Sequence, residues 1–123
     1  MDLSYLLELD SEDYYNCMLD MPWDEPPFDI RKSENKVHAC ASDVWVDVDE
    51  NGTLYCYSTA LFVRGLVVAM FSNIDVDRIQ EYRLRDFDYI IESKVSQRRY
   101  RGLAGTLMKI QKIVNDKYIS RGD

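Results

Sequence analysis

The 123-residue chain has few of the residues on which most enzyme classes depend. Its five glycines and single histidine supply no phosphate-binding loop, no H-E-x-x-H metal motif and no glycine-rich dinucleotide fingerprint. A serine hydrolase triad would have to use His38, the only imidazole, yet no G-x-S-x-G nucleophile elbow is present. Most enzyme classes therefore lose support.

Long apolar runs and early positive charge are also missing. The longest apolar run, residues 60–71, contains Arg64 and Gly65 and is much shorter than the roughly 20 residues of a membrane span. Residues 1–30 hold nine acidic side chains and no lysine or arginine, whereas secretory and transit peptides need early positive charge. These features predict a cytoplasmic protein with no transmembrane segment.

The charge balance is acidic and uneven. Fifteen basic against 22 acidic residues give a net charge of −7, which disfavours nucleic acid as the main partner. The basic residues gather near the carboxyl end, where residues 94–121 hold eight of them and one acid, Asp116. The two ends of the chain are therefore expected to present surfaces of opposite charge.

Three cysteines, Cys17, Cys40 and Cys56, are too few and too widely spaced for a secreted disulfide framework, so free thiols are expected. Together with His38 they are the right ligand types for zinc, but the spacing lacks the short knuckle of structural zinc sites. Cys17 and Cys56 lie among apolar and aromatic neighbours, which favours a role as small buried side chains.

The first half of the chain predicts short helices, an arm and a hairpin. Two short helices are expected within residues 1–20, with Asp2 and Ser11 as N-caps, and the proline-rich segment 21–28 follows as a connecting arm. Alternating residues on either side of Asn51-Gly52 predict a β-hairpin, and residues 35–38 are a candidate third strand, which places Cys40 in the connection between strands.

The second half of the chain is helical by pattern. An apolar helix is expected over residues 60–71 after a Ser58 or Thr59 cap, followed by two short helices, 76–82 and 87–94, capped by Asp75 and Asp86. Ser96 caps a long final helix with one apolar stripe: Leu103, Leu107, Ile110, Val114 and Tyr118. Together these elements predict one α+β domain with a core large enough for its size.

Three segments carry a more specific signal. They are Asn-Lys-Val-His-Ala-Cys-Ala-Ser-Asp-Val-Trp-Val at 35–46, Ser-Thr-Ala-Leu-Phe-Val-Arg-Gly-Leu at 58–66 and Arg-Tyr-Arg-Gly-Leu at 99–103. In motif, order and separation they resemble the SufE family of sulfur-acceptor proteins, over residues 35–114. Residues 1–34 look shortened and diverged, Ala39 stands where the family usually has glycine, and Thr59 where it usually has aspartate.

The resemblance implies a fold and a function. The fold would be a single SufE/IscU-like α+β domain spanning residues 1–123, with a small antiparallel sheet of about three strands packed against amino-terminal and carboxy-terminal helices. The protein would accept persulfide sulfur from a cysteine desulfurase of the SufS-like or CsdA-like type, stimulate that enzyme, and pass the sulfur to a SufBCD-like iron–sulfur scaffold. Pyridoxal phosphate would belong to the desulfurase, so the chain needs no cofactor and is a sulfur carrier rather than a self-contained enzyme.

The resemblance also assigns the site. Cys40 matches the family's persulfide-forming cysteine. His38, by proximity, and Arg99, by its match to the family's arginine, are candidates for lowering the pKa of the thiol. The simpler interpretation is a solvent-facing His38 and an Arg99 that holds loops by hydrogen bonding, while Asp43 either contacts a partner or faces water.

Two alternatives stay open at this stage. A scaffold-type protein would use Cys40, His38 and another cysteine as ligands for zinc or a nascent cluster, and it needs three or four converging ligands. A non-catalytic module would bind the desulfurase without accepting sulfur. The number of ligands that converge on Cys40 separates the scaffold from the acceptor, which needs one thiol.

Overall fold

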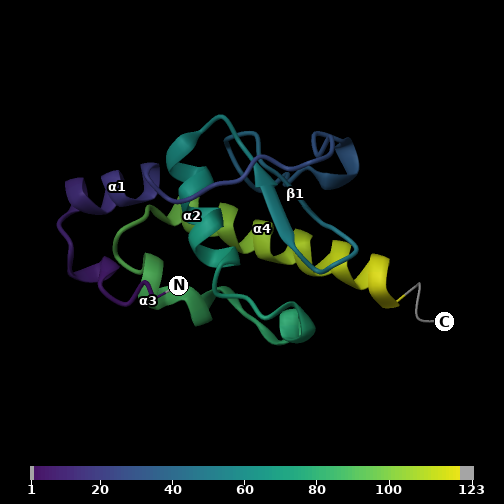
Figure 1. The fold of residues 1–123 in the computed structure, drawn as a ribbon. Coiled ribbons are helices and arrows are strands. Elements are labelled where there is room, and N and C mark those ends of the chain that lie inside the picture. The colour runs from purple at the N-terminus through teal and green to yellow at the C-terminus, as the bar shows by residue number, and fades with distance from the viewer. Residues whose placement is uncertain (1, 120–123) are drawn as a thin grey trace.

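The computed structural model, which describes residues 2–119, combines helices with a two-stranded antiparallel sheet (Figure 1). The longest helix, α4 (Gln97–Val114), runs through the middle of the molecule toward the carboxyl end, and β1 (Trp45–Val48) lies alongside it. Helices α1 (Ser11–Leu19) and α2 (Leu61–Phe71) pack against each other at one end. The expected α+β class is confirmed.

The hairpin forms as predicted. Strand β1 pairs with β2 (Leu54–Tyr57) in a register that places Val46 opposite Cys56. At the turn, the Asp49 carboxylate accepts hydrogen bonds from the backbone N–H groups of Asn51 and Thr53, and Gly52 has a φ of +83°, a conformation that glycine adopts without strain.

The predicted third strand is wrong. Residues Ser33–Asn35 form a short 3₁₀ helix, and Lys36 makes only a single bridge with Trp45, so the sheet of the described residues has two strands. The buried Asn35 side-chain amide donates to the Ile30 carbonyl and to the Asp47 carboxylate. These bonds hold the segment in a turn, because a strand would remove the amide from both partners.

Three predicted helix caps are also displaced. Asp10, not Ser11, caps α1 by accepting a hydrogen bond from the Asp13 N–H at 2.8 Å, and Ser11 is the first helical residue. Asp2 accepts from the Ser4 N–H, in the turn before the 3₁₀ helix η1 (Leu6–Glu8). Asp86 accepts from the Arg83 N–H and so starts η4 (Leu84–Phe87) rather than a helix at residue 87.

Helix α2 begins without a side-chain cap, because Ser58 Oγ accepts from the Ala60 N–H and neither Ser58 nor Thr59 caps the helix. Most of its faces are buried, as its apolar sequence predicts. Gly65 lets α1 approach closely: a Cβ at this position would lie 1.9 Å from the Met18 carbonyl oxygen. The α1–α2 contact is therefore backbone against backbone.

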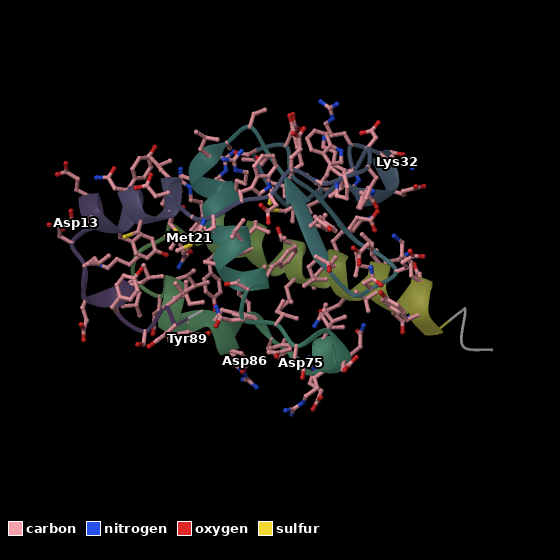
Figure 2. All side chains as sticks on the ribbon, viewed as in Figure 1. Asp13, Met21, Lys32, Asp75, Asp86 and Tyr89 are labelled. Atoms are coloured by element: carbon pink, nitrogen blue, oxygen red, sulfur yellow. The ribbon has the colours of Figure 1, made fainter. Side chains whose placement is uncertain are left out.

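Short helices connect α2 to α4. They are η3 (Val76–Glu81), η4 and α3 (Asp88–Ile91). Asp75 accepts from the Asp77 N–H, as predicted for the cap of the first of them. Asp75 and Asp86 lie along the same edge of the molecule, with Tyr89 further toward the α1 end (Figure 2).

Helix α4 is capped as predicted, since Ser96 Oγ accepts from the Arg99 N–H. Its apolar stripe is buried in the core, and Tyr118 follows in the one-turn π-helix η5 (Asn115–Ile119), half-buried. Among residues 2–119 no helix combines the length and the apolar character that a membrane crossing requires.

The proline-rich arm is fixed to the outside of the hairpin. Trp23 Nε1 donates to the Cys56 carbonyl at 2.9 Å, and the Arg64 guanidinium lies 4.1 Å from the centre of the Trp23 ring. Phe28 packs edge-on against Tyr55. The arm therefore packs on the strand that carries Cys56 through its two aromatic residues.

Candidate functional site

The segment that carries Cys40 is a loop, residues 38–43, held at its two ends. Val37 N–H donates to the Val44 carbonyl at 2.8 Å, which closes the loop at its base. Between these residues, the described structure has no backbone–backbone hydrogen bond from the loop to the rest of the chain. Ala39 and Ala41 are exposed, while Cys40 is half-buried and turned toward α4.

The Cys40 thiol lies against the second turn of α4. Its Sγ donates to the Gly102 carbonyl at 3.3 Å and lies 3.6 Å from the Thr106 hydroxyl, which itself donates to the same carbonyl at 2.8 Å. Burial raises the pKa of the Cys40 thiol, and the Thr106 hydrogen bond acts in the opposite direction. In this position the protonated thiol is favoured over the nucleophilic thiolate.

A pocket of about 290 Å³ opens next to the thiol. Its apolar wall comes from α2 and α4, with Val63, Leu66 and Leu103. Its polar rim includes Arg98 and Arg99 at the start of α4. The site therefore offers one sulfur atom beside a small apolar cavity with cationic side chains at its rim.

The three supporting residues of the sequence analysis occupy different places. Arg99 lines the same pocket as Cys40, and its guanidinium lies 4.8 Å from the centre of the Phe62 ring. Asp43 forms an exposed ion pair with Lys36 at 3.0 Å, at the base of the loop. His38 is exposed and does not line the pocket. Of these three residues, the structure brings only Arg99 into the pocket with the thiol.

Sequence reasoning missed the residues on which the thiol rests. Thr106 is fully buried, and Gly102 and Gly105 face the loop: a Cβ at Gly102 would lie 3.1 Å from Cys40 Sγ, and one at Gly105 would lie 2.3 Å from the Ala39 Cβ. The sequence did contain a signal for these residues, because Gly102, Gly105 and Thr106 lie close together in a predicted helix. Glycine is unfavourable inside a helix unless another segment packs closely against it.

The other two cysteines have different surroundings. Cys56 is 4% exposed in β2, and burial raises the pKa of its thiol to about 12. Cys17 is half-buried on α1. Within residues 2–119, no three or more histidine, cysteine, aspartate or glutamate side chains are grouped so that they could hold a metal ion. The scaffold alternative therefore lacks the ligand cluster that it requires.

Comparison with known proteins identifies the family of the chain. Residues 5–114 match the family model of SufE, the Fe-S metabolism associated domain, so the match includes most of the diverged amino-terminal segment as well as the three motifs. A search of curated proteins gave no match. Because the match covers most of the chain, including the Cys40 loop and α4, the chain belongs to the SufE family, whose domain is associated with iron–sulfur metabolism.

Proposed function

We propose that this protein accepts sulfur from a cysteine desulfurase on Cys40 and passes it on for iron–sulfur cluster assembly. The observation that carries the proposal is the position of Cys40, whose sulfur borders a pocket from a loop whose only backbone–backbone hydrogen bond, among the described residues, closes its base. Cys56 is fixed in a strand and buried. Membership of the SufE family supports the link to iron–sulfur metabolism.

The chemistry needs one thiolate and no redox partner. The Cys40 thiolate attacks the outer sulfur of the desulfurase persulfide, a new bond forms between Cys40 Sγ and that sulfur, and the sulfur–sulfur bond of the desulfurase breaks. The desulfurase cysteine leaves as a thiolate with the electron pair. The outer sulfur keeps its oxidation state and any proton that it carried, so the exchange is balanced without an added oxidant or reductant.

The pocket suits a sulfur carrier. A persulfide exposed to solvent reacts with thiols and oxidants, so it is protected when the carrying loop returns to an apolar cavity. Val63, Leu66 and Leu103 supply such a wall beside Cys40, and the Arg98 and Arg99 guanidinium groups at the rim attract the negative charge of a persulfide. The loop would therefore alternate between a withdrawn and a transferring position.

In this proposal the partner proteins supply the source and the receiver of the sulfur. The desulfurase, of SufS-like or CsdA-like type, contains the pyridoxal phosphate that releases sulfur from cysteine, and a SufBCD-like scaffold receives the sulfur. The present chain is then a carrier and an activator, acting in the reducing cytoplasm where its thiols stay free.

Intact-mass spectrometry tests this function. After incubation with a desulfurase and cysteine, the wild-type protein should gain one sulfur atom, which a reductant removes. Cys17→Ala and Cys56→Ala should gain the same mass, and Cys40→Ala should gain none, because only Cys40 borders the pocket from a loop.

Each other result has a definite meaning. Sulfur retained on Cys40→Ala would refute the assignment of Cys40. Desulfurase binding without any mass gain on the wild type would favour the non-catalytic binding module. Stoichiometric zinc in untagged protein, lost on Cys40→Ala, would favour the scaffold alternative despite the absence of a ligand cluster within residues 2–119.

A further inference from the structure

We propose that Gly105 and Gly102 of α4 form a seat for the Ala39–Cys40 segment, and that the contact between residues 105 and 39 sets how often the loop leaves the helix. Gly105 is then a positioning residue: it contacts the neighbour of the reacting residue and controls where the thiol lies. The consequence for sulfur transfer rests on the proposed function. The seat itself is independent of it, because any reagent that needs the thiolate reports on release.

The seat is made by the absence of side chains on one face of α4. A Cβ at Gly105 would lie 2.3 Å from the Ala39 Cβ, a distance that real Cβ atoms do not reach, and 3.7 Å from the Ala39 Cα. A Cβ at Gly102 would lie 3.1 Å from Cys40 Sγ. The loop therefore rests on the helix backbone, and the Ala39 methyl group occupies the space that a side chain at residue 105 would fill.

Few other contacts hold the loop there. Within the described structure, its backbone makes no backbone–backbone hydrogen bond between Val37 and Val44. The other polar contacts of the loop are those of the thiol with the Gly102 carbonyl and the Thr106 hydroxyl, and the partly exposed Lys36–Asp43 ion pair at the base. Exposed ion pairs contribute little to stability. The fit of Ala39 and Cys40 against α4 is thus the main contact that keeps the loop in place.

The seat also keeps the sulfur unreactive. In the seat, the thiol donates a hydrogen bond to the Gly102 carbonyl oxygen, and a thiolate at the same place would face the negative end of that carbonyl. The pocket wall desolvates the same sulfur, and this burial outweighs the Thr106 hydrogen bond although Arg98 and Arg99 also line the pocket. A thiolate able to attack a partner's sulfur therefore forms after the loop leaves the helix, and the observed rate is the rate of the released loop multiplied by its population.

A matched test of the seat moves one methyl group from residue 39 to residue 105. Gly105→Ala places two Cβ atoms 2.3 Å apart and expels the loop, while alanine suits the helix better than glycine. In the double variant Ala39→Gly/Gly105→Ala the clash is gone: the new Cβ has its nearest neighbours at 3.7 Å (Cα of residue 39) and 3.9 Å (Val37 Cγ1), both ordinary contacts. The loop can then return to the helix.

The measurement is the rate at which iodoacetamide alkylates Cys40 in the protein alone, followed on the Cys40 peptide by mass spectrometry. We expect Gly105→Ala to raise the rate roughly 10-fold and the double variant to return it to within about twofold of the wild type. The midpoint of the rate against pH should fall in Gly105→Ala toward the ordinary cysteine pKa of about 8.5 and rise again in the double variant. Met108→Ala, an exposed change on the same helix, should leave both unchanged.

Two results would overturn the seat. An unchanged or lower rate in Gly105→Ala would show that the contact does not restrain the thiol. A raised rate that the double variant does not reverse would show general loosening of α4 instead. If Gly105→Ala fails to fold, Gly102→Ala presses on the same segment more mildly, with a Cβ 3.1 Å from Cys40 Sγ, and should raise the rate as well; its failure to do so would also refute the seat.

The experiment separates this inference from the proposed function. Alkylation needs no desulfurase, so the seat can be refuted while sulfur loading of Cys40 is retained. Conversely, if Cys40 gains no sulfur but the methyl exchange behaves as expected, the seat stands and only the identity of the reacting partner is wrong.

Discussion

Two glycines, Gly65 on α2 and Gly105 on α4, let a backbone segment lie directly on a helix, but the two segments differ in how they are held. At Gly65 the neighbour is α1, a hydrogen-bonded helix whose Tyr14 and Met18 are buried in the core. At Gly105 the neighbour is the loop of residues 38–43, whose only backbone–backbone hydrogen bond within the described structure closes its base. The same packing device therefore makes a fixed joint in one region and a releasable contact in the other.

Cys56 and Cys40 differ in the same way. Cys56 belongs to the fixed region: its strand is paired with β1, and the Trp23 indole donates to its carbonyl. Cys40 belongs to the releasable one. Burial raises the pKa of both thiols, so burial alone does not distinguish them. The attachment of the backbone distinguishes the two cysteines, because the Cys40 loop can bring its sulfur to the surface while β1 and β2 stay paired.

Alanine in place of each glycine gives the largest expected difference between the two regions. Gly65→Ala should lower the free energy of unfolding by about 3 kcal/mol, because its Cβ would lie 1.9 Å from the Met18 carbonyl oxygen and two helices would have to move apart. Gly105→Ala should change the same quantity by less than about 1 kcal/mol, since the loop gives way. Urea denaturation of both variants checks this, and equal losses of stability would contradict the division.

The secondary structure shows which features a local pattern can predict. The hairpin follows from alternating residues around Asn51-Gly52, and α4 follows from Ser96 and its apolar stripe; both are present. The third strand fails because the Asn35 amide bonds to Ile30 and Asp47, one of which is 12 residues away. A pattern of neighbouring residues contains no information on such a contact.

Some features of the site could be predicted from the sequence and others could not. The motif around Cys40 marks the candidate thiol from sequence, and the arginine motif places Arg99 at the start of α4, where it lines the same pocket. The seat could not be predicted, because Gly102 lies 62 residues from Cys40 along the chain and its role depends on how the loop meets the helix. A glycine inside a predicted helix signals a close contact without identifying the neighbour.

A smaller effect is expected for the pH dependence of the free energy of unfolding. In the folded protein the pKa of Cys56 is raised to about 12, so between pH 8 and 10 the unfolded chain releases the Cys56 proton and the folded protein keeps it. The unfolded state is therefore favoured as pH rises, and Cys56 should cost about 1–2 kcal/mol of stability over this range. Urea denaturation of wild type and Cys56→Ala at each pH measures this contribution as the difference between their slopes.

The control for this prediction is Met108→Ala, which removes an exposed side chain that has no titrating group. It should leave the pH slope close to that of the wild type. If Cys56→Ala keeps the full wild-type slope, the Cys56 thiol is not as firmly buried as the fixed region requires, and the contrast with Cys40 weakens.

The smallest expected effect concerns which region meets the desulfurase. The partner must bring its own sulfur within bonding distance of Cys40, and the basic start of α4 lies beside that loop, with Arg98 at the rim of the pocket and Arg101 exposed one turn further. The acidic residues Glu12 and Asp13 lie on α1, with Asp13 at its outer end (Figure 2). Opposite charges on the two surfaces allow a matched reversal of two residues on each.

Arg98→Glu/Arg101→Glu should slow desulfurase stimulation roughly 10-fold at low salt, and Glu12→Lys/Asp13→Lys should change it less than about twofold, because charge near the contact sets the association rate. Asp10 stays unchanged in the second variant, since it caps α1 and its loss would unfold the helix end. The gap should shrink as salt screens the charges, whereas a defect in the pocket itself would persist at high salt. Sulfide release measured across a salt series distinguishes these cases. An equal or opposite ranking of the two variants at low salt would place the partner on the α1 side. The releasable loop would then have to reach a partner bound there.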